Sequence, residues 1–438
     1  MTAISIFLGL ALFLSCVFFA LARGRKCTYI TLLEWAILGI GLIYGLGWVL
    51  VVGLTSVGYN ARWSYHILPF KDSFLIHNLL AFLVVPCVIA GWLIATRISR
   101  MGTRLSSVHL SFSPGYLHLC AWILLGISIF LRWFYVKAFG GFIEYLEYSA
   151  AIRSGIFQIY NKWSFLQPFS GVAIFSTFLF VASLLEDRRN IIKIIGFALS
   201  SSFSFYVLYS QLGRLGFLVF VSTILLSVLY FKEIKPRLLI IGSLFGAGAM
   251  MILAYTISQN FDLKGSDCIQ EFVSRELCFP FVSFFTQLDY GEYLYLWFRD
   301  FIFSPLYLLP SSWWGQWFDE ISQINTLVVM GMRKGDFGVT GGIPVDLITL
   351  GLMQSSFFGV FVVGALFGVM LRFLQGFVDG IASGGLRALL CAYLSIRVAI
   401  LAIAYAQPYH LISGTFGILV SIVLIFAFSK LNKMRISS

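Results

Sequence analysis

Long apolar runs, each followed by a short charged connection, recur along most of this 438-residue chain. Each run has about 18–25 residues, and a helix of roughly 20 residues crosses a bilayer core about 30 Å thick. Backbone amides and carbonyls inside lipid must be paired within their own segment, so runs of this length must be helical. Charged residues make up only 11% of the chain, against roughly 25% in soluble domains. The sequence therefore predicts an all-α, polytopic transmembrane helix bundle.

We predict about eleven spans, because each crossing needs roughly 20 apolar residues. The first run lacks a charged start and has no small-residue cleavage site before Arg23, so we expect a retained helix and not a signal peptide. The sequence contains neither an internal repeat nor two matching halves. The expected spans lie near residues 3–22, 33–56, 75–96, 116–137, 164–185, 191–211, 215–231, 238–258, 355–375, 387–405 and 412–429.

Positively charged residues gather in alternate connections between these spans. The positive-inside rule makes that side cytoplasmic, so we expect the N-terminus outside and the C-terminus inside. The net charge of +11 then reflects topology, and no nucleic-acid partner is expected. More than half of the 30 lysines and arginines lie on this side: Arg23, Arg25, Lys26, Arg97, Arg100, Arg104, Arg188, Arg189, Lys193, Lys232, Lys235, Arg237, Arg372, Arg387, Lys430, Lys433 and Arg435.

Two connections on the opposite side, 138–163 and 259–354, are long. Loops longer than about 15 residues in compact proteins are usually functional or disordered, and the many aromatic residues in the second argue against disorder. Cys268 and Cys278 lie in this loop, and the sequence is equally compatible with a disulfide and with two thiols. Because no metal-ligand spacing and no phosphate-binding loop is present, we expect neither a metal nor a nucleotide cofactor.

Four arginines stand at outer span ends, in the outer loops or inside a span. Arg214 occupies the tight turn SQLGRLGFL, Arg153 follows two carboxylates in EYLEYSAAIRSG, and Arg299 begins RDFIFSP. Arg397 lies within a span, where an arginine costs roughly 2.5 kcal/mol or more and usually faces a cavity. Guanidinium donates paired hydrogen bonds to phosphate, so we expect the four to converge on a diphosphate. The alternatives are separate ion pairs and, for Arg214, snorkelling to lipid phosphate.

Carboxylates near the same face are candidate proton acceptors. Asp346 follows a glycine-rich bend in GVTGGIPVDLITLGLM, beside the start of a helix, and is our first choice for a general base. The rivals are Glu147, Asp289, Glu292 and His410, although a histidine at a helix end is more often a capping or interfacial residue.

Three segments, in this order on this topology, resemble the bacterial O-antigen polymerases of the Wzy type: SQLGRLGFL, FRDFIFSPLYLLPSSWW and GVTGGIPVDLITLGLM. The resemblance covers most of the chain and departs at Asp346, where we expect a glutamate. It implies a fold similar to that of the membrane lipid-phosphosugar glycosyltransferases, located in the bacterial inner membrane with the active site facing the periplasm. The expected regions are N-terminal transmembrane helices in 1–258 with a periplasmic loop at 138–163, a periplasmic loop and re-entrant segment in 259–354, and C-terminal transmembrane helices in 355–438.

The resemblance also implies the reaction, in which the growing glycan moves from undecaprenyl diphosphate onto the non-reducing sugar of a lipid-linked repeat unit. The expected partners are the lipid-linked oligosaccharide donor and acceptor, the lipid bilayer, a chain-length regulator and a flippase. The catalytic residues are then Asp346, Arg214 and Arg299, and the residues that bind diphosphate or glycan are Arg153, Arg214, Arg299, Arg397, His410 and Glu147.

Other functions are compatible with the same sequence. An O-antigen ligase uses the same donor lipid, and a transporter or flippase of lipid-linked oligosaccharides also has many spans. A flippase has little use for a long outer loop, and a structural protein without chemistry has little use for Arg397 inside a span. The sugar, the linkage and the stereochemical course stay open.

Overall fold

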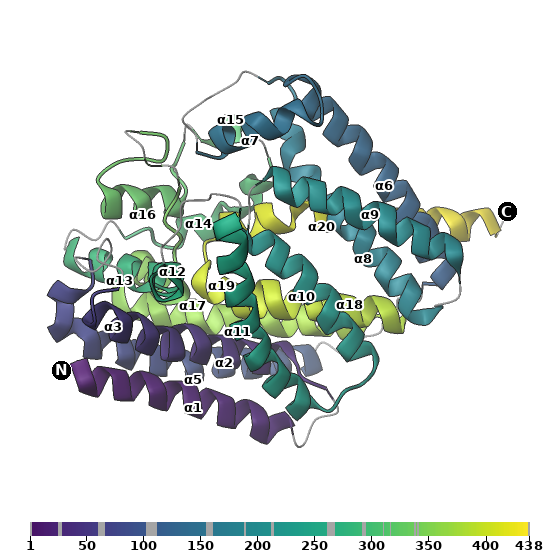
Figure 1. Cartoon of the computed structure of the whole chain (residues 1–438). Coiled ribbons are helices and arrows are strands. Elements are labelled where there is room, and N and C mark those ends of the chain that lie inside the picture. The colour runs from purple at the N-terminus through teal and green to yellow at the C-terminus, as the bar shows by residue number, and fades with distance from the viewer. Residues whose placement is uncertain are drawn as a thin grey trace.

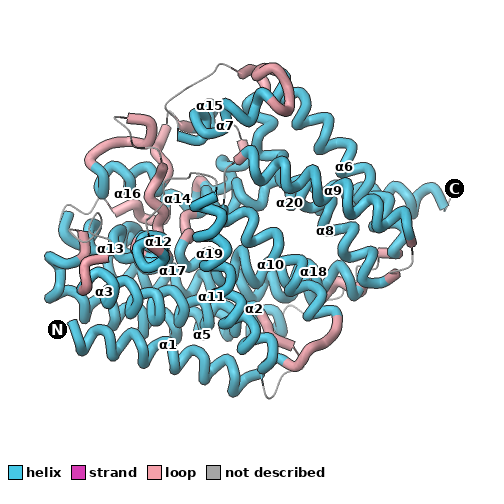
Figure 2. Tube along the Cα trace, viewed as in Figure 1, coloured by secondary structure: helices cyan, strands magenta, loops and turns pink. Residues whose placement is uncertain are grey.

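The computed structural model describes residues 2–24, 29–59, 66–101, 112–154, 161–187, 190–211, 214–260, 268–290, 295–309, 311–315, 317–336, 339 and 341–436. Within these ranges every regular element is a helix, and the helices form one bundle (Figures 1 and 2). The all-α prediction is thereby confirmed.

The helical elements follow one another closely along the chain. In order they are α1 (Thr2–Gly24), α2 (Leu32–Ile40), η1 (Gly41–Gly47), α3 (Trp48–Ser56), η2 (Leu68–Ser73), α5 (Phe74–Met101), α6 (Pro114–Lys137), α7 (Glu144–Ser154), η3 (Ser164–Ser170), α8 (Gly171–Glu186), α9 (Ile191–Ser210), α10 (Arg214–Phe231), α11 (Pro236–Asn260), α12 (Ile269–Leu277), α13 (Phe279–Tyr290), α14 (Arg299–Ile302), η4 (Ser304–Leu308), α15 (Ser311–Trp314), α16 (Ile321–Met330), α17 (Leu347–Asp379), α18 (Gly384–Leu394), η5 (Ser395–Ile400), α19 (Leu401–Ala404) and α20 (Pro408–Ile436).

Among the described residues, eight helical segments are long and apolar enough to cross a membrane, and each overlaps a predicted span. The other three predicted spans fall in α10, α11 and α20, whose described apolar parts are shorter. The chain is thus a membrane protein by the length and composition of its helices, and the total of eleven spans stays a prediction. The eight segments are Thr2–Gly24, Leu32–Ser56, Leu68–Ser99, Pro114–Lys137, Ser164–Glu186, Ile191–Ser210, Leu347–Asp379 and Gly384–Ala404.

The buried apolar side chains form two large clusters. One joins α1, α2, α5, α13 and α17, and the other joins α6, α8, α9, α18 and α20. Tyr230 of α10 and Leu394 of α18 pack against both clusters, so these helices connect the two halves of the bundle. Figure 1 shows α6, α8, α9 and α20 above and to the right of the first group, with α18 level with α17 and to its right.

Glycines allow a close approach of the helices α5 and α17. A Cβ atom on Gly368 would lie 2.0 Å from the carbonyl oxygen of Val88, and one on Gly91 would lie 1.9 Å from that of Ala365. Small residues let helix backbones approach where lipid removes the hydrophobic driving force for association. The long helix of the C-terminal part is therefore fixed against the third predicted span.

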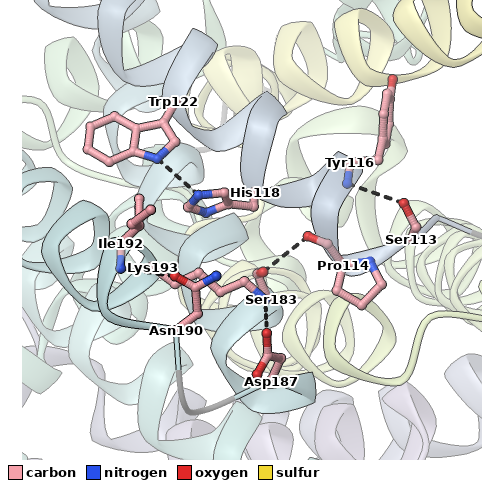
Figure 3. Close-up of polar contacts among 10 residues, drawn as sticks. All are labelled: Ser113, Pro114, Tyr116, His118, Trp122, Ser183, Asp187, Asn190, Ile192 and Lys193. Carbon is pink, nitrogen blue, oxygen red and sulfur yellow. Dashed lines mark hydrogen bonds and ion pairs between the residues drawn. The ribbon is translucent and has the colours of Figure 1, made fainter.

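The two ends of the bundle differ in the residues they carry. At the end that we call the basic end, Arg23 contacts Glu34 at 2.7 Å, and Lys193 contacts Asp187 at 2.9 Å. Figure 3 shows the second pair near the start of α9, where Ser183 also donates to the Pro114 carbonyl of α6 at 3.1 Å. The opposite end, which we call the loop end, carries α7 and the short helices α12 to α16 (Figure 1).

Candidate functional site

Helix α17 is broken eight residues after its start, at Ser355 and Ser356. A Cβ atom on Gly359 would lie 2.0 Å from the Gly351 carbonyl oxygen, and one on Gly351 would lie 2.4 Å from the Val360 Cα. Because residues equally distant from the break meet, the first eight residues fold back along the rest of the helix. At 1.5 Å per residue, the start of this short half lies about 12 Å along the helix from the break.

The break itself has an unusual backbone. Ser356 has φ 58° and ψ −150°, and the loop residues Trp297 and Phe298 also have positive φ. The amide of Trp297 donates to the Gln354 carbonyl at 3.1 Å, and the amide of Phe298 donates to Gln354 Oε1 at 2.7 Å. Strained backbone of this kind costs of order 1–3 kcal/mol per residue and gathers at functional sites. Here the strained turn fixes Arg299, the next residue, beside the tip of α17.

Asp346 is fully buried at the start of the short half of α17. Its Oδ2 accepts hydrogen bonds from the Tyr44 hydroxyl at 2.6 Å and from the amides of Ile348 and Thr349 at 3.1 and 3.4 Å. Its Oδ1 is buried and has no hydrogen-bond partner in the described part of the chain. A buried acceptor left alone is costly. Asp346 therefore caps the helix with one oxygen and keeps the other for a different group.

A second interruption, between α19 and α20, lies beside the start of the short half of α17. The amide of Ala406 donates to the Val345 carbonyl at 2.7 Å, and the amide of Val345 donates to Gln407 Oε1 at 3.1 Å. The stretch that leads to Asp346 thus pairs with the non-helical residues after α19. Backbone that is not helical is tolerated at membrane depth only where protein or a water-filled cavity surrounds it.

Arg397 and His410 lie at this second interruption. Arg397 is 8% exposed and sits in the π-helical turn η5, and its Nη2 donates to the His410 carbonyl at 3.1 Å. The His410 ring packs against Tyr405 at a centroid distance of 5.3 Å, and its Nε2 is buried without a partner among the described residues. Asp346, Arg397 and His410 therefore gather around one junction of broken helices.

The aromatic loop carries a further polar cluster. The Tyr307 hydroxyl donates to Asp300 Oδ1 at 2.8 Å, and Asp300 and Glu320 are both buried. Asp300 Oδ2 and Glu320 Oε2 have no hydrogen-bond partner within the described ranges. Burial raises the pKa of Glu320 to about 7, and the nearby Asp300 charge adds to this. Burial also raises the pKa of Asp300 above its usual value.

This loop cluster adjoins the junction through aromatic contacts. The Arg299 guanidinium lies 5.5 Å from the ring of Phe318. The Tyr307 and Trp314 rings pack against Tyr409, the residue before His410, at 5.3 and 6.0 Å. The tertiary structure thus brings Arg299 to the same end of the bundle as Arg397.

The remaining predicted residues are placed only in part. Arg153 lies in α7 and Arg214 begins α10, but both side chains fall outside the described residues, so their convergence with Arg397 stays a prediction. Glu147 is exposed on α7 and Asp289 is exposed near the end of α13. Glu292 lies outside the described residues.

Cys268 and Cys278 flank α12 and are not joined by a disulfide. The two cysteines are ten positions apart across this helix, so their Cα atoms lie about 15 Å apart along its axis. A disulfide needs Cα atoms within roughly 7 Å of each other, so this fold excludes the bridge that the sequence left open.

Sequence reasoning missed Asp300 and Glu320 as candidate acids or bases. Asp300 stands beside Arg299 in the motif that was recognised, but Glu320 has no sequence signal other than its place after the tryptophans. Only their burial in the structure identifies both carboxylates as candidates.

No protein-family model, no curated protein and no solved structure matches this chain. Its function must therefore be inferred from its own residues.

Proposed function

We propose that this chain is an O-antigen polymerase of the bacterial inner membrane. It transfers the growing glycan from undecaprenyl diphosphate onto the non-reducing sugar of a lipid-linked repeat unit, with the loop end in the periplasm and eleven spans in all. The observation that carries the proposal is the buried Arg397, inside a candidate span, which donates to the His410 carbonyl near the interruption that pairs with the stretch before Asp346. His410 Nε2 and Asp346 Oδ1 are buried there without a partner among the described residues. An intramembrane arginine of this kind is a functional-site hypothesis by default.

The arrangement suits a diphosphate leaving group. As the bond between the anomeric carbon and the diphosphate oxygen breaks, negative charge builds on that oxygen. A guanidinium held rigidly near it stabilises the transition state more than the ground state. The Arg397 guanidinium is held by the His410 carbonyl, and the Arg299 guanidinium packs on the Phe318 ring at 5.5 Å, so both have restricted positions. No nucleotide is needed, because the lipid diphosphate already activates the sugar.

The acceptor hydroxyl must lose a proton to a nearby base. Asp346 keeps Oδ1 available and is oriented by three hydrogen bonds to its other oxygen. Glu320 keeps Oε2 available, and a pKa of about 7 suits proton exchange at neutral pH. Asp346 lies within the bundle and Glu320 in the loop, so the depth at which the sugar binds decides between them.

One observation favours a different function, that of a transporter or flippase for lipid-linked oligosaccharides. Two interrupted helical regions meet where Val345, just before α17, pairs with Gln407, and discontinuous helices often form the substrate sites of transporters. An O-antigen ligase would use the same donor lipid and is the nearest enzymatic alternative.

Deleting the gene and separating the lipopolysaccharide on a gel distinguishes these functions. Loss of a polymerase leaves lipid A core capped with a single repeat unit. Loss of a ligase or a flippase leaves core without any repeat, and that pattern would overturn the proposal. Complementation with Arg214→Lys then tests the predicted arginine of α10, since wild-type chain lengths at normal expression would remove it from the site.

A further inference from the structure

Residues 301–318, which we call the uncharged segment, contain no aspartate, glutamate, lysine or arginine. Charged residues stand directly at both of its ends, with Arg299 and Asp300 before it and Asp319 and Glu320 after it. The segment contains η4 and α15 and leads to α16 at the loop end. Its composition resembles that of a span, but its helices are too short to cross a bilayer, which needs roughly 20 helical residues. A different environment must therefore accommodate its apolar side chains.

One face of the uncharged segment is packed against the bundle. Tyr307, Trp314 and Phe318 are buried in one cluster. The cluster packs against Tyr409 and Ile412, which lie in the first two turns of α20. The Trp314 and Phe318 rings stack at 5.4 Å, and the Tyr307 ring lies 5.3 Å from that of Tyr409. This face is therefore fixed at the start of α20.

The cluster lies on the outward side of α20. Ile412 comes seven residues before Leu419 and eleven before Val423, and in a helix with 3.6 residues per turn these three side chains share one face. Leu419 and Val423 are exposed, as expected of the lipid-facing side of a predicted span. At 1.5 Å per residue, Leu419 lies about 10 Å further from the loop end than Ile412. The uncharged segment therefore covers the lipid-facing side of α20 where the predicted span begins.

The other face of the uncharged segment carries large exposed side chains. Ile302, Trp313 and Trp317 are 68, 64 and 72% exposed. Each tryptophan directly precedes a member of the buried cluster, so neither ring belongs to the face that packs on α20. Tryptophan is enriched where a bilayer meets water, because its ring is apolar and its indole N–H finds a polar partner there. Both the side chains and their place beside α20 thus fit the layer of lipid head groups.

We propose that the uncharged segment lies in the head-group layer of the leaflet at the loop end, with Trp313 and Trp317 inserted between phospholipids. Interfacial elements of this kind bury their apolar face by about 5–10 Å at the boundary between head groups and acyl chains. Arg299 and Asp300 directly precede the segment, so the same anchor holds both residues at the membrane surface. This contact with the membrane does not depend on which reaction the chain catalyses.

The test measures tryptophan fluorescence of the full chain, reconstituted in vesicles of phosphatidylethanolamine and phosphatidylglycerol. Part of the phospholipid carries bromine on the acyl chain, either near the head group or near the chain end, and bromine quenches the rings that it contacts. The emission of the two rings is the difference between wild type and Trp313→Phe/Trp317→Phe. We expect bromine near the head group to lower this difference about twofold or more, and bromine at the chain end to lower it less. Aqueous iodide should have the smallest effect.

The control is Trp35→Phe, at a buried ring of α2, and the emission that this variant removes should be quenched by neither bromine nor iodide. If the double variant does not fold, Trp313→Phe and Trp317→Phe report the two rings separately.

Two outcomes would overturn the proposal. Quenching of the difference emission by iodide and not by brominated phospholipid would place the rings in water. Aromatic rings also stack on sugars, so a glycan is the competing occupant. Protection from iodide by oligosaccharide released from the host's own lipopolysaccharide, without any quenching by bromine, would assign this surface to a glycan.

Discussion

Charged side chains are buried at both ends of the bundle, but they are satisfied differently. At the basic end, buried Glu34 contacts Arg23, and buried Lys193 contacts Asp187. At the loop end, Arg132, Asp346 and Glu320 each keep polar atoms without a partner in the described structure. A buried polar group is normally paired, and each exception asks for an explanation. The comparison indicates that the buried charges at the basic end stabilise the fold through ion pairs, whereas these three side chains at the loop end keep atoms that a ligand could pair with.

The largest expected effect comes from Arg397→Lys. Lysine keeps the charge but lacks the planar fork of guanidinium, and removing one fixed donor from a developing anion costs roughly 10²-fold or more in rate. We expect polymer on a lipopolysaccharide gel to fall by about that factor at normal expression. Arg333→Lys, at an exposed arginine 2.8 Å from Asp319, is the control and should leave polymer unchanged. If Arg397→Lys produced as much polymer as the wild type, the idea that buried charges at the loop end serve function would be contradicted.

The second largest effect is expected from Gly359→Ala. This variant tests whether the short half of α17 must contact the rest of the helix closely to fold back as a hairpin at Ser355 and Ser356. The new Cβ would lie 2.0 Å from the Gly351 carbonyl oxygen, and overpacking of this kind typically costs about 1–3 kcal/mol. We expect a lower melting temperature of the purified protein and loss of polymer. Gly246→Ala in α11, where no atom lies within 4 Å of the new Cβ, should not destabilise the protein. Equal melting temperatures for both variants would contradict the hairpin.

A change at the basic end should affect stability without affecting chemistry. Glu34 accepts a hydrogen bond from the Thr31 amide at 2.8 Å and contacts Arg23, so it both caps α2 and neutralises a charge. Loss of a capping residue costs about 0.5–2 kcal/mol, and the half-exposed Arg23 regains water when its partner is removed. We expect Glu34→Ala to lower the melting temperature and to leave activity per folded molecule unchanged. If Glu34→Ala lost more activity than the loss of folded protein explains, the basic end would have a functional role as well.

The smallest expected effect is a pH dependence at the loop end. The pKa of Glu320 rises from 4.5 to about 7 in the fold, so the folded state prefers the protonated carboxyl. Its contribution to stability is complete below pH 4.5 and is lost as the pH rises toward and through 7. Glu320→Gln should therefore flatten the fall in melting temperature over this range. Asp319→Asn, at the neighbouring carboxylate, is the control, and its melting temperature should change with pH as that of the wild type does.

The main features of the fold were predictable because they follow from local physics. A bilayer of fixed thickness and the need to pair every backbone group determine that 33–56 and 116–137 are helices, and the structure has helices there. The alternating basic connections also predict which helix ends face the cytoplasm, and this orientation stays a prediction. For the candidate site, the sequence predicted the residues but not their arrangement. It identified Arg397, Asp346 and His410 as polar residues in or beside apolar runs.

What the sequence by itself determined is therefore the helical class, the position of the apolar runs and the presence of charge among them. The tertiary structure alone decided which of those charges have partners. Asp346 depends on Tyr44, 302 residues earlier, and Arg132 depends on Ser210, 78 residues later. Such pairings arise from the packing of distant helices, which no local pattern of residues encodes. For the same reason the nine residues between Cys268 and Cys278 did not decide from sequence whether a disulfide forms, whereas the helix that they form excludes it.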